Sequence, residues 1–129
     1  MNKRSLGGFF EDAAGDYLEK NGLRILDKNV RCGRLGEIDL IGIDTTVEDG
    51  DTLVFAEIKY RSSDRFGQGV YAVDITKQKT IRRCAEYYLK AHSFDGFIRF
   101  DVVSIDDGTV TWIRDAFSTK LKHVHIDEN

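Results

Sequence analysis

The fold is decided by Gly36-Glu37-Ile38-Asp39-Leu40 and by Phe55-Ala56-Glu57-Ile58-Lys59-Tyr60. Each stretch has the hydrophobic residues of a buried β-strand, yet charged residues stand inside it. Side chains two positions apart share one face of a strand, so Glu57 and Lys59 are expected to point to the same side. A buried charge is costly unless it is paired or binds a metal. The two stretches therefore predict a charged site on a β-sheet.

The residue types of this site are typical of phosphate chemistry. An Asp on one strand, followed by Glu and Lys two residues apart on the next, can place a divalent cation beside a phosphate. Magnesium prefers carboxylate oxygens together with water and phosphate oxygens, and a lysine can stabilise charge that develops on the phosphate. Asp39, Glu57 and Lys59 are therefore candidate site residues. On the Glu-x-Lys motif alone, a solvated pair at a sheet edge stays the open alternative.

Composition limits the class of protein. The chain has 129 residues, of which 41% are hydrophobic and 32% charged, as expected for one globular domain. The net charge of −3 does not by itself indicate nucleic-acid binding, although basic residues gather at 59–65 and 77–90. No apolar run reaches membrane length, and the N-terminus lacks the apolar segment of a signal peptide. Cys32 and Cys84 form no metal or redox motif, so a cytoplasmic protein is expected.

Hydrophobic periodicity predicts the element order α-β-β-β-α-β-β. The expected helices cover 9–20 and 75–91. The expected strands cover 24–31, 37–43, 53–61, 97–105 and 109–114. This order predicts an α/β fold with a mixed sheet whose third strand is central, flanked by one helix on each face or by both on one face.

The whole chain, 1–129, is expected to form a single domain with a core of about 8–117 and a C-terminal tail at 118–129. The tail contains the pair His123 and His125, for which a polar tail is a simpler interpretation than a metal site.

Each predicted helix carries one charged residue near its apolar stripe. Glu11 lies at the border of the stripe of the first helix, beside Leu18. Lys77 lies with the apolar face of the second helix, one turn before Ile81. For Lys77, a side chain that extends along the surface to reach water is an equally good interpretation.

The order of helix Glu, strand Asp, strand Glu-x-Lys and helix resembles the PD-(D/E)xK nuclease superfamily. From about Gly8 to Phe117 the chain is similar to the YraN family within it, small bacterial proteins described as similar to Holliday-junction resolvases. The matching pieces are Glu11-Asp12 with Ala14, Tyr17 and Leu18, Asn29, GEIDLI at 36–41, FAEIKYR at 55–61, Phe66-Gly67, Ala72-Val73, Lys77 and RFDVV at 99–103. The resemblance implies a restriction-endonuclease-like fold, although the superfamily's proline is Ile38 here.

The resemblance also implies residue roles. Metal ligands would be the carboxylates of Asp39 and Glu57, the backbone carbonyl of Ile58, and Glu11 from the helix. Lys59 would be the catalytic lysine. Arg61 and Lys77 would contact nucleic acid. The implied cofactor is Mg²⁺ or Mn²⁺.

Two functions follow as hypotheses. The first is a metal-dependent endonuclease that hydrolyses DNA phosphodiester bonds, including branched DNA such as Holliday junctions. Because resolving a four-way junction needs two symmetric cuts, a homodimer is expected, with the C-terminal strands as a candidate surface. The second is a non-catalytic module that binds nucleic acid or protein on a nuclease-like scaffold.

Overall fold

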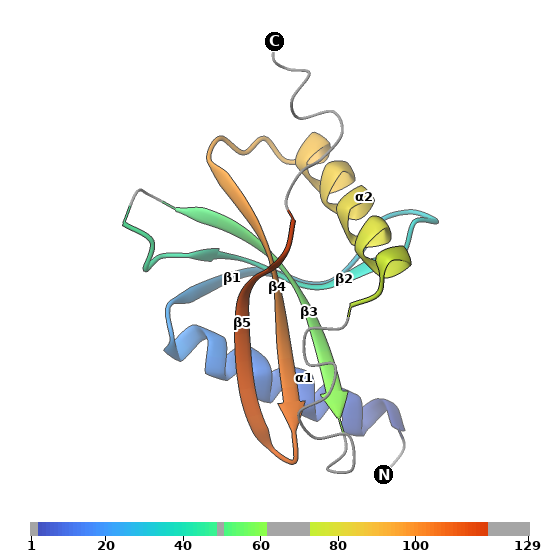
Figure 1. Cartoon of the computed structure of the whole chain (residues 1–129), viewed down its shortest axis with the longest axis vertical. Coiled ribbons are helices and arrows are strands. Elements are labelled where there is room, and N and C mark those ends of the chain that lie inside the picture. The colour runs from blue at the N-terminus through green and yellow to red at the C-terminus, as the bar shows by residue number, and fades with distance from the viewer. Residues whose placement is uncertain (1–2, 49–50, 62–72, 119–129) are drawn as a thin grey trace.

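The computed structural model describes residues 3–48, 51–61 and 73–118, with residues 3–10 and 61 described for the backbone alone. Within these ranges the element order is the predicted one, α-β-β-β-α-β-β (Figure 1). The elements are α1 (Lys3–Lys20), β1 (Leu23–Arg31), β2 (Glu37–Asp44), β3 (Thr52–Arg61), α2 (Ile75–Ala91), β4 (Phe97–Asp106) and β5 (Thr109–Phe117). Neither described helix is long and apolar enough to cross a membrane.

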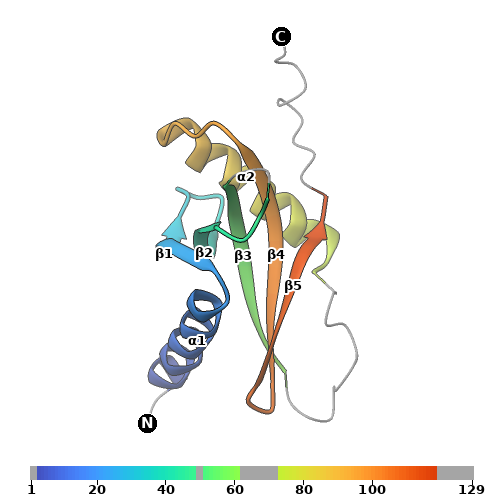
Figure 2. The ribbon, with the colours of Figure 1, turned by 90° about the vertical axis from the view of Figure 1, so that its left-hand side faces the viewer.

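The strands form one mixed sheet in the order β1-β2-β3-β4-β5. Neighbours pair antiparallel from β1 to β3 and again between β4 and β5, whereas β3 and β4 are parallel. A parallel pair needs a crossover connection, and α2 lies in that connection. Figures 1 and 2 show β3 in the middle of the sheet, which confirms the mixed α/β fold and the central third strand.

The sheet buries both of its faces, one under each helix. Val54 packs with Leu18 of α1, whereas its neighbour Phe55 packs with Tyr88 of α2. The rings of Phe55 and Tyr88 meet edge to face at 5.9 Å between centroids. Successive side chains of a strand point to opposite sides. One helix therefore covers each face, which resolves the alternative that the sequence left open.

Two predicted boundaries differ from the observed ones by more than one residue. Helix α1 begins at Lys3 instead of residue 9, because the two glycines before residue 9 have low helix propensity and hid its first turns. Strand β5 continues to Phe117 beyond a positive φ of 56° at Asp115. The hairpin before it turns through Asp107 and Gly108, both with positive φ, as the sequence predicted.

A buried ionic network joins β2, β4 and β5 on the face that α1 covers. Asp101 is fully buried and accepts hydrogen bonds from Arg99 Nε and Nη2, Trp112 Nε1 and the Asp115 backbone N–H, at 2.8–2.9 Å. Arg99 Nη2 also donates to Asp44 Oδ2 at 2.9 Å. One guanidinium thus bridges two buried carboxylates, and its hydrogen bonds offset much of their desolvation.

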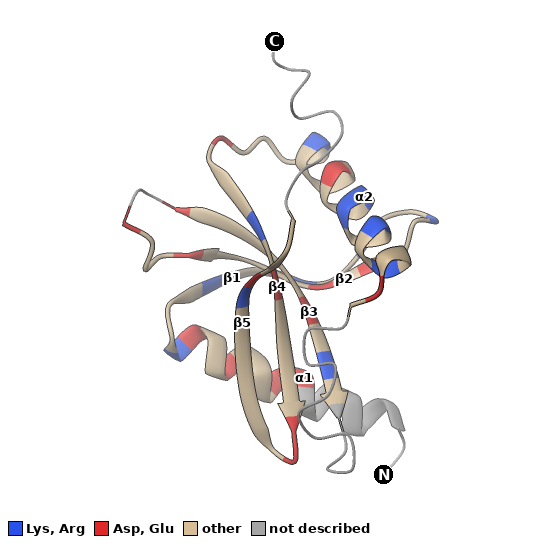
Figure 3. Cartoon of the chain, in the orientation of Figure 1, with Lys and Arg blue, Asp and Glu red and all other residues tan. Residues whose placement is uncertain are grey.

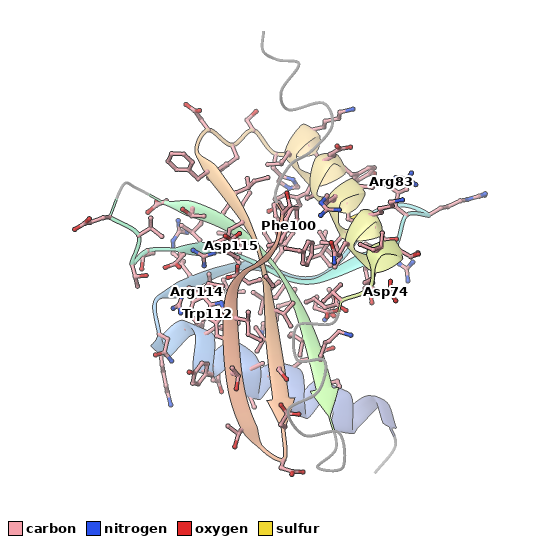
Figure 4. The ribbon with its side chains drawn as sticks, viewed as in Figure 1. Asp74, Arg83, Phe100, Trp112, Arg114 and Asp115 are labelled. Carbon is pink, nitrogen blue, oxygen red and sulfur yellow. The ribbon has the colours of Figure 1, made fainter. Side chains whose placement is uncertain are left out.

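Arg114 lies at the solvent-exposed side of this network. Its guanidinium lies 3.6 Å from the centroid of the Trp112 ring, and its Nε lies 3.6 Å from Asp44 Oδ2. Figure 4 shows Trp112, Arg114 and Asp115 close together on β5. Asp44 is the last residue of β2 and only 1% exposed.

We expect Arg99→Met to lower the free energy of unfolding by about 3 to 5 kcal/mol, because it leaves Asp44 and Asp101 buried without their shared cation. Arg83→Met, at an exposed position of α2 (Figure 4), should change it by less than about 0.5 kcal/mol. Urea denaturation measures both. A loss below about 1 kcal/mol for Arg99→Met would show that the network contributes little to stability.

Candidate functional site

The site lies where the pairing between β2 and β3 stops. The last paired residues are Leu40 of β2 and Ala56 of β3. Asp39 and Glu57 are the next residues beyond this pair on the two strands. Continued pairing would set these two side chains opposite each other on one face. Instead, Oδ2 of Asp39 accepts a hydrogen bond from the backbone N–H of Ile58 at 2.8 Å. The side-chain carboxylate of Asp39 therefore takes the place of a main-chain carbonyl as the acceptor of this hydrogen bond. The same bond holds the carboxylate beside Glu57.

The two carboxyl groups strongly affect each other's protonation. Burial first, and then the negative charge of Asp39, raise the pKa of Glu57 to about 7. Burial also raises the pKa of Asp39, whereas the hydrogen bond from Ile58 opposes that rise. A hydrogen bond between the two carboxyls lowers the pKa of Asp39 and raises that of Glu57. The two carboxyl groups therefore titrate as one coupled pair.

Lys77 of α2 forms an ion pair with this site. Its Nζ lies 3.7 Å from Oε2 of Glu57, whose side chain is only 12% exposed. Among neighbouring charges, Lys77 contributes most to lowering the pKa of both Asp39 and Glu57. Lys59 lowers the pKa of Glu57 to a smaller degree. Figure 3 shows the acidic positions of β2 and β3 and the basic positions along α2.

Glu11 approaches the same end of β3 from the other helix. It is half-buried, unlike Asp12 and Asp16 of the same helix. Burial, followed by the charges of Glu11 and Asp39, raises the pKa of Tyr60, so the Tyr60 hydroxyl lies within the field of both acids. Within the described side chains, however, no three His, Cys, Asp or Glu residues gather into a group that could hold a metal ion. Glu11 thus lies near Tyr60, at the same end of β3 as the carboxylate pair.

The remaining predicted site residues are placed only in part. The side chain of Ile58 is buried with the residues under α1, and its backbone N–H is bonded to Asp39. The side chain of Arg61, at the end of β3, lies outside the described residues, as do His123 and His125.

Tyr60 is the residue at this site that the sequence did not single out. Its side chain is 46% exposed although it belongs to the central strand, where it directly follows Lys59. The sequence signal was present, because Tyr60 ends the hydrophobic run of β3 and directly follows the Glu-x-Lys motif.

Comparisons with known proteins agree on one family. The model of the uncharacterised protein family UPF0102 matches residues 10–105. The chain is 40% identical over 111 residues to a UPF0102 protein of Shewanella pealeana, covering 86% of this chain and 94% of that one. It is 41% identical over 114 residues to one of Nitrosomonas europaea, covering 86% and 92%. A relative from Caldicellulosiruptor saccharolyticus is 42% identical over 106 residues, covering 81% and 85%.

The raised pKa of Glu57 predicts a pH dependence of stability. From the ordinary value of 4.5 to about 7, the folded protein keeps a proton that the unfolded chain has released. The free energy of unfolding should therefore fall across this range and level off above it. Above pH 7 we expect Glu57→Gln to be more stable than wild type by about 1 to 3 kcal/mol.

The difference between variant and wild type should vanish below about pH 4.5, where Glu57 is protonated in both states. Denaturation curves from pH 4 to 9 measure it. Glu19→Gln, an exposed acid of α1, serves as the control and should follow wild type. Parallel curves for Glu57→Gln and wild type would contradict the raised pKa.

Proposed function

Since the chain belongs to the uncharacterised protein family UPF0102, which is the YraN group, we propose its function from its own site: a metal-dependent endonuclease that hydrolyses DNA phosphodiester bonds. The observation that carries this proposal is the pair of carboxyl groups of Asp39 and Glu57 at the end of the β2–β3 ladder, with two lysines beside it. Groups with raised pKa values near specific charges are typical of functional sites.

The residues present suit Mg²⁺ or Mn²⁺. Both candidate ligands are carboxylates, the oxygen donors that these hard cations prefer. Burial and mutual repulsion make two adjacent negative charges unfavourable here without a cation, as the raised pKa values indicate. Asp39 and Glu57 would hold the ion, with the Ile58 carbonyl and Glu11 as further ligands in the proposal. Bound there, the ion supplies Lewis-acid stabilisation of charge on the phosphate.

The other residues of the site act on the substrate and on the attacking water. Lys59 shares the strand face of Glu57 and is proposed to orient the water and to offset negative charge on the phosphate in the transition state. Lys77 and Arg61 are proposed to contact neighbouring phosphates of the DNA. Asp39 also has a positioning role, because its bond to Ile58 N–H keeps β2 and β3 in place beside the reacting group.

The proposal extends to branched DNA such as a four-way junction. Cutting such a junction symmetrically needs two sites, which a two-fold homodimer would supply. β5 is an edge strand of the sheet. Among the described residues, no strand pairs with its outer edge. This edge is therefore the proposed dimer surface.

We expect Asp39→Asn, Glu57→Gln and Lys59→Ala each to lower Mg²⁺-dependent cleavage by about 10²-fold or more. Their losses should not add in double variants, because the residues act as one unit. The assay compares linear, flapped, looped and four-way DNA with Mg²⁺ and with Mn²⁺. Asp16→Asn, an exposed acid of α1, is the control and should cleave as wild type does. Full activity of Lys59→Ala would remove the role given to that lysine.

A melting experiment tests the metal site without a known substrate. Mn²⁺ at about one hundred times its Kd should stabilise wild type by about 2.7 kcal/mol, or roughly 5 to 10 °C in Tm. Asp39→Asn should melt higher than wild type without cation, because it removes one of two repelling charges and keeps an oxygen that can accept from Ile58 N–H. Added Mn²⁺ should hardly shift that variant.

The same melting curves separate the two candidate functions. A non-catalytic scaffold predicts no Mn²⁺ response in either protein. Identical wild-type curves with and without millimolar Mn²⁺ would therefore favour a binding module over an endonuclease.

A further inference from the structure

Lys77 stands where a helix disfavours a cation. Asp74 caps the start of α2, and its Oδ1 accepts the Lys77 backbone N–H at 2.8 Å, so Lys77 lies in the first helical turn. The helix dipole is positive at this end and destabilises a lysine there. The carboxylate of Asp74 at the cap is bonded to the backbone N–H of Lys77, and the first turn itself contains no acidic residue. An interaction outside the helix can therefore add to the stabilisation of the ammonium group.

That interaction is with the carboxylate pair across the sheet face. The backbone bond to Asp74 and the helical spacing direct Lys77 to the same side as the buried Ile81, Cys84 and Tyr88. Its Nζ reaches Oε2 of Glu57 at 3.7 Å. Lys79, two positions along, is exposed on the outer side of α2. The lysine is thus placed over the carboxylates by the helix geometry.

We propose that Lys77 is a resident counter-ion of this site, which holds Asp39 and Glu57 together in the cation-free protein and which a divalent cation displaces on binding. The inference deepens the proposed function and rests on it. A cation between the same two carboxylates would be repelled by an ammonium group 3.7 Å from one of them. The ammonium group and a divalent cation therefore cannot both interact fully with the same two carboxylates.

The side chain of Lys77 is free to leave. It is 41% exposed, and its flexible four-carbon stem can carry the ammonium group to water or to a phosphate. The cap of α2 is unaffected, because Asp74 binds the backbone N–H of Lys77 and not its side chain. Displacement therefore needs a side-chain rotation and no movement of the helix.

The proposal predicts opposite effects on cation binding and on catalysis. Removing the ammonium group should make the site more negative and favour the cation, whereas cleavage should fall because a phosphate contact is lost. A residue that only supports the fold would not strengthen cation binding.

The test is Mn²⁺ affinity measured by calorimetry without DNA, on the full chain. We expect Lys77→Met to bind Mn²⁺ about fivefold more tightly than wild type, as removal of a partly exposed ion pair allows. Lys77→Arg, which keeps the charge, should bind as wild type does. Lys79→Met is the matched control on the same helix, since it makes the same change in net charge, and it should also resemble wild type.

Equal or weaker binding by Lys77→Met would overturn the counter-ion role, as would an equal gain in Lys79→Met. Binding seen only in Lys77→Met would support it. If neither wild type nor Lys77→Met bound Mn²⁺, the proposed metal site itself would fail and the inference with it. A melting curve of each variant without Mn²⁺ identifies any effect that arises from a damaged fold.

Discussion

The hydrogen bond from Ile58 N–H to Asp39 Oδ2 is the interaction on which the site depends. At the end of the β2–β3 ladder it takes the place of one main-chain bond, so the strands stay close enough for two carboxyl groups to meet. A buried backbone N–H left without an acceptor would be costly. Asp39 therefore has a structural role and a chemical one, because this contact holds its charge beside Glu57, where it adds to the effect of burial on the pKa of Glu57.

The same chain contains a second pair of acidic residues, the buried Asp44 and Asp101, and the comparison is informative. Asp44 and Asp101 are bridged by Arg99 with bonds of 2.9 Å, and the pKa of Asp44 is lowered chiefly by the bonds from Thr46 and Arg99 that outweigh its burial. At the other pair, the cation contact among the described residues is the longer, half-exposed ion pair of Lys77 with Glu57, and the pKa values of Asp39 and Glu57 are raised. A planar guanidinium presents a rigid fork of donors to carboxylates, whereas an ammonium group is a compact charge on a flexible stem. The protein thus encloses one pair completely and leaves the other incompletely neutralised.

The sequence predicted what depends on local pattern. The order of elements, the central position of β3 and the shared face of Glu57 and Lys59 all follow from alternation over a few residues. The network of Arg99 with Asp44 was not predictable in this way, because its partners are 55 positions apart and each resembles an ordinary surface charge. The positive φ at Asp115 was missed for a related reason, since the backbone N–H there bonds to the distant carboxylate of Asp101. The ion pair of Lys77 with Glu57 likewise required the placement of α2 over the sheet.

The mixed connectivity of the sheet also has a consequence for how the chain folds. Strands β1 to β3 are joined by short connections and form a local meander, whereas β3 and β4 pair in parallel only after the whole of α2 has been crossed. Loop-closure entropy opposes such non-local pairing until the contacts that reward it exist. The meander alone already brings Asp39 and Glu57 together. We therefore expect the two carboxylates to meet first during folding, and the helix that carries Lys77 to dock onto a preformed patch of negative charge.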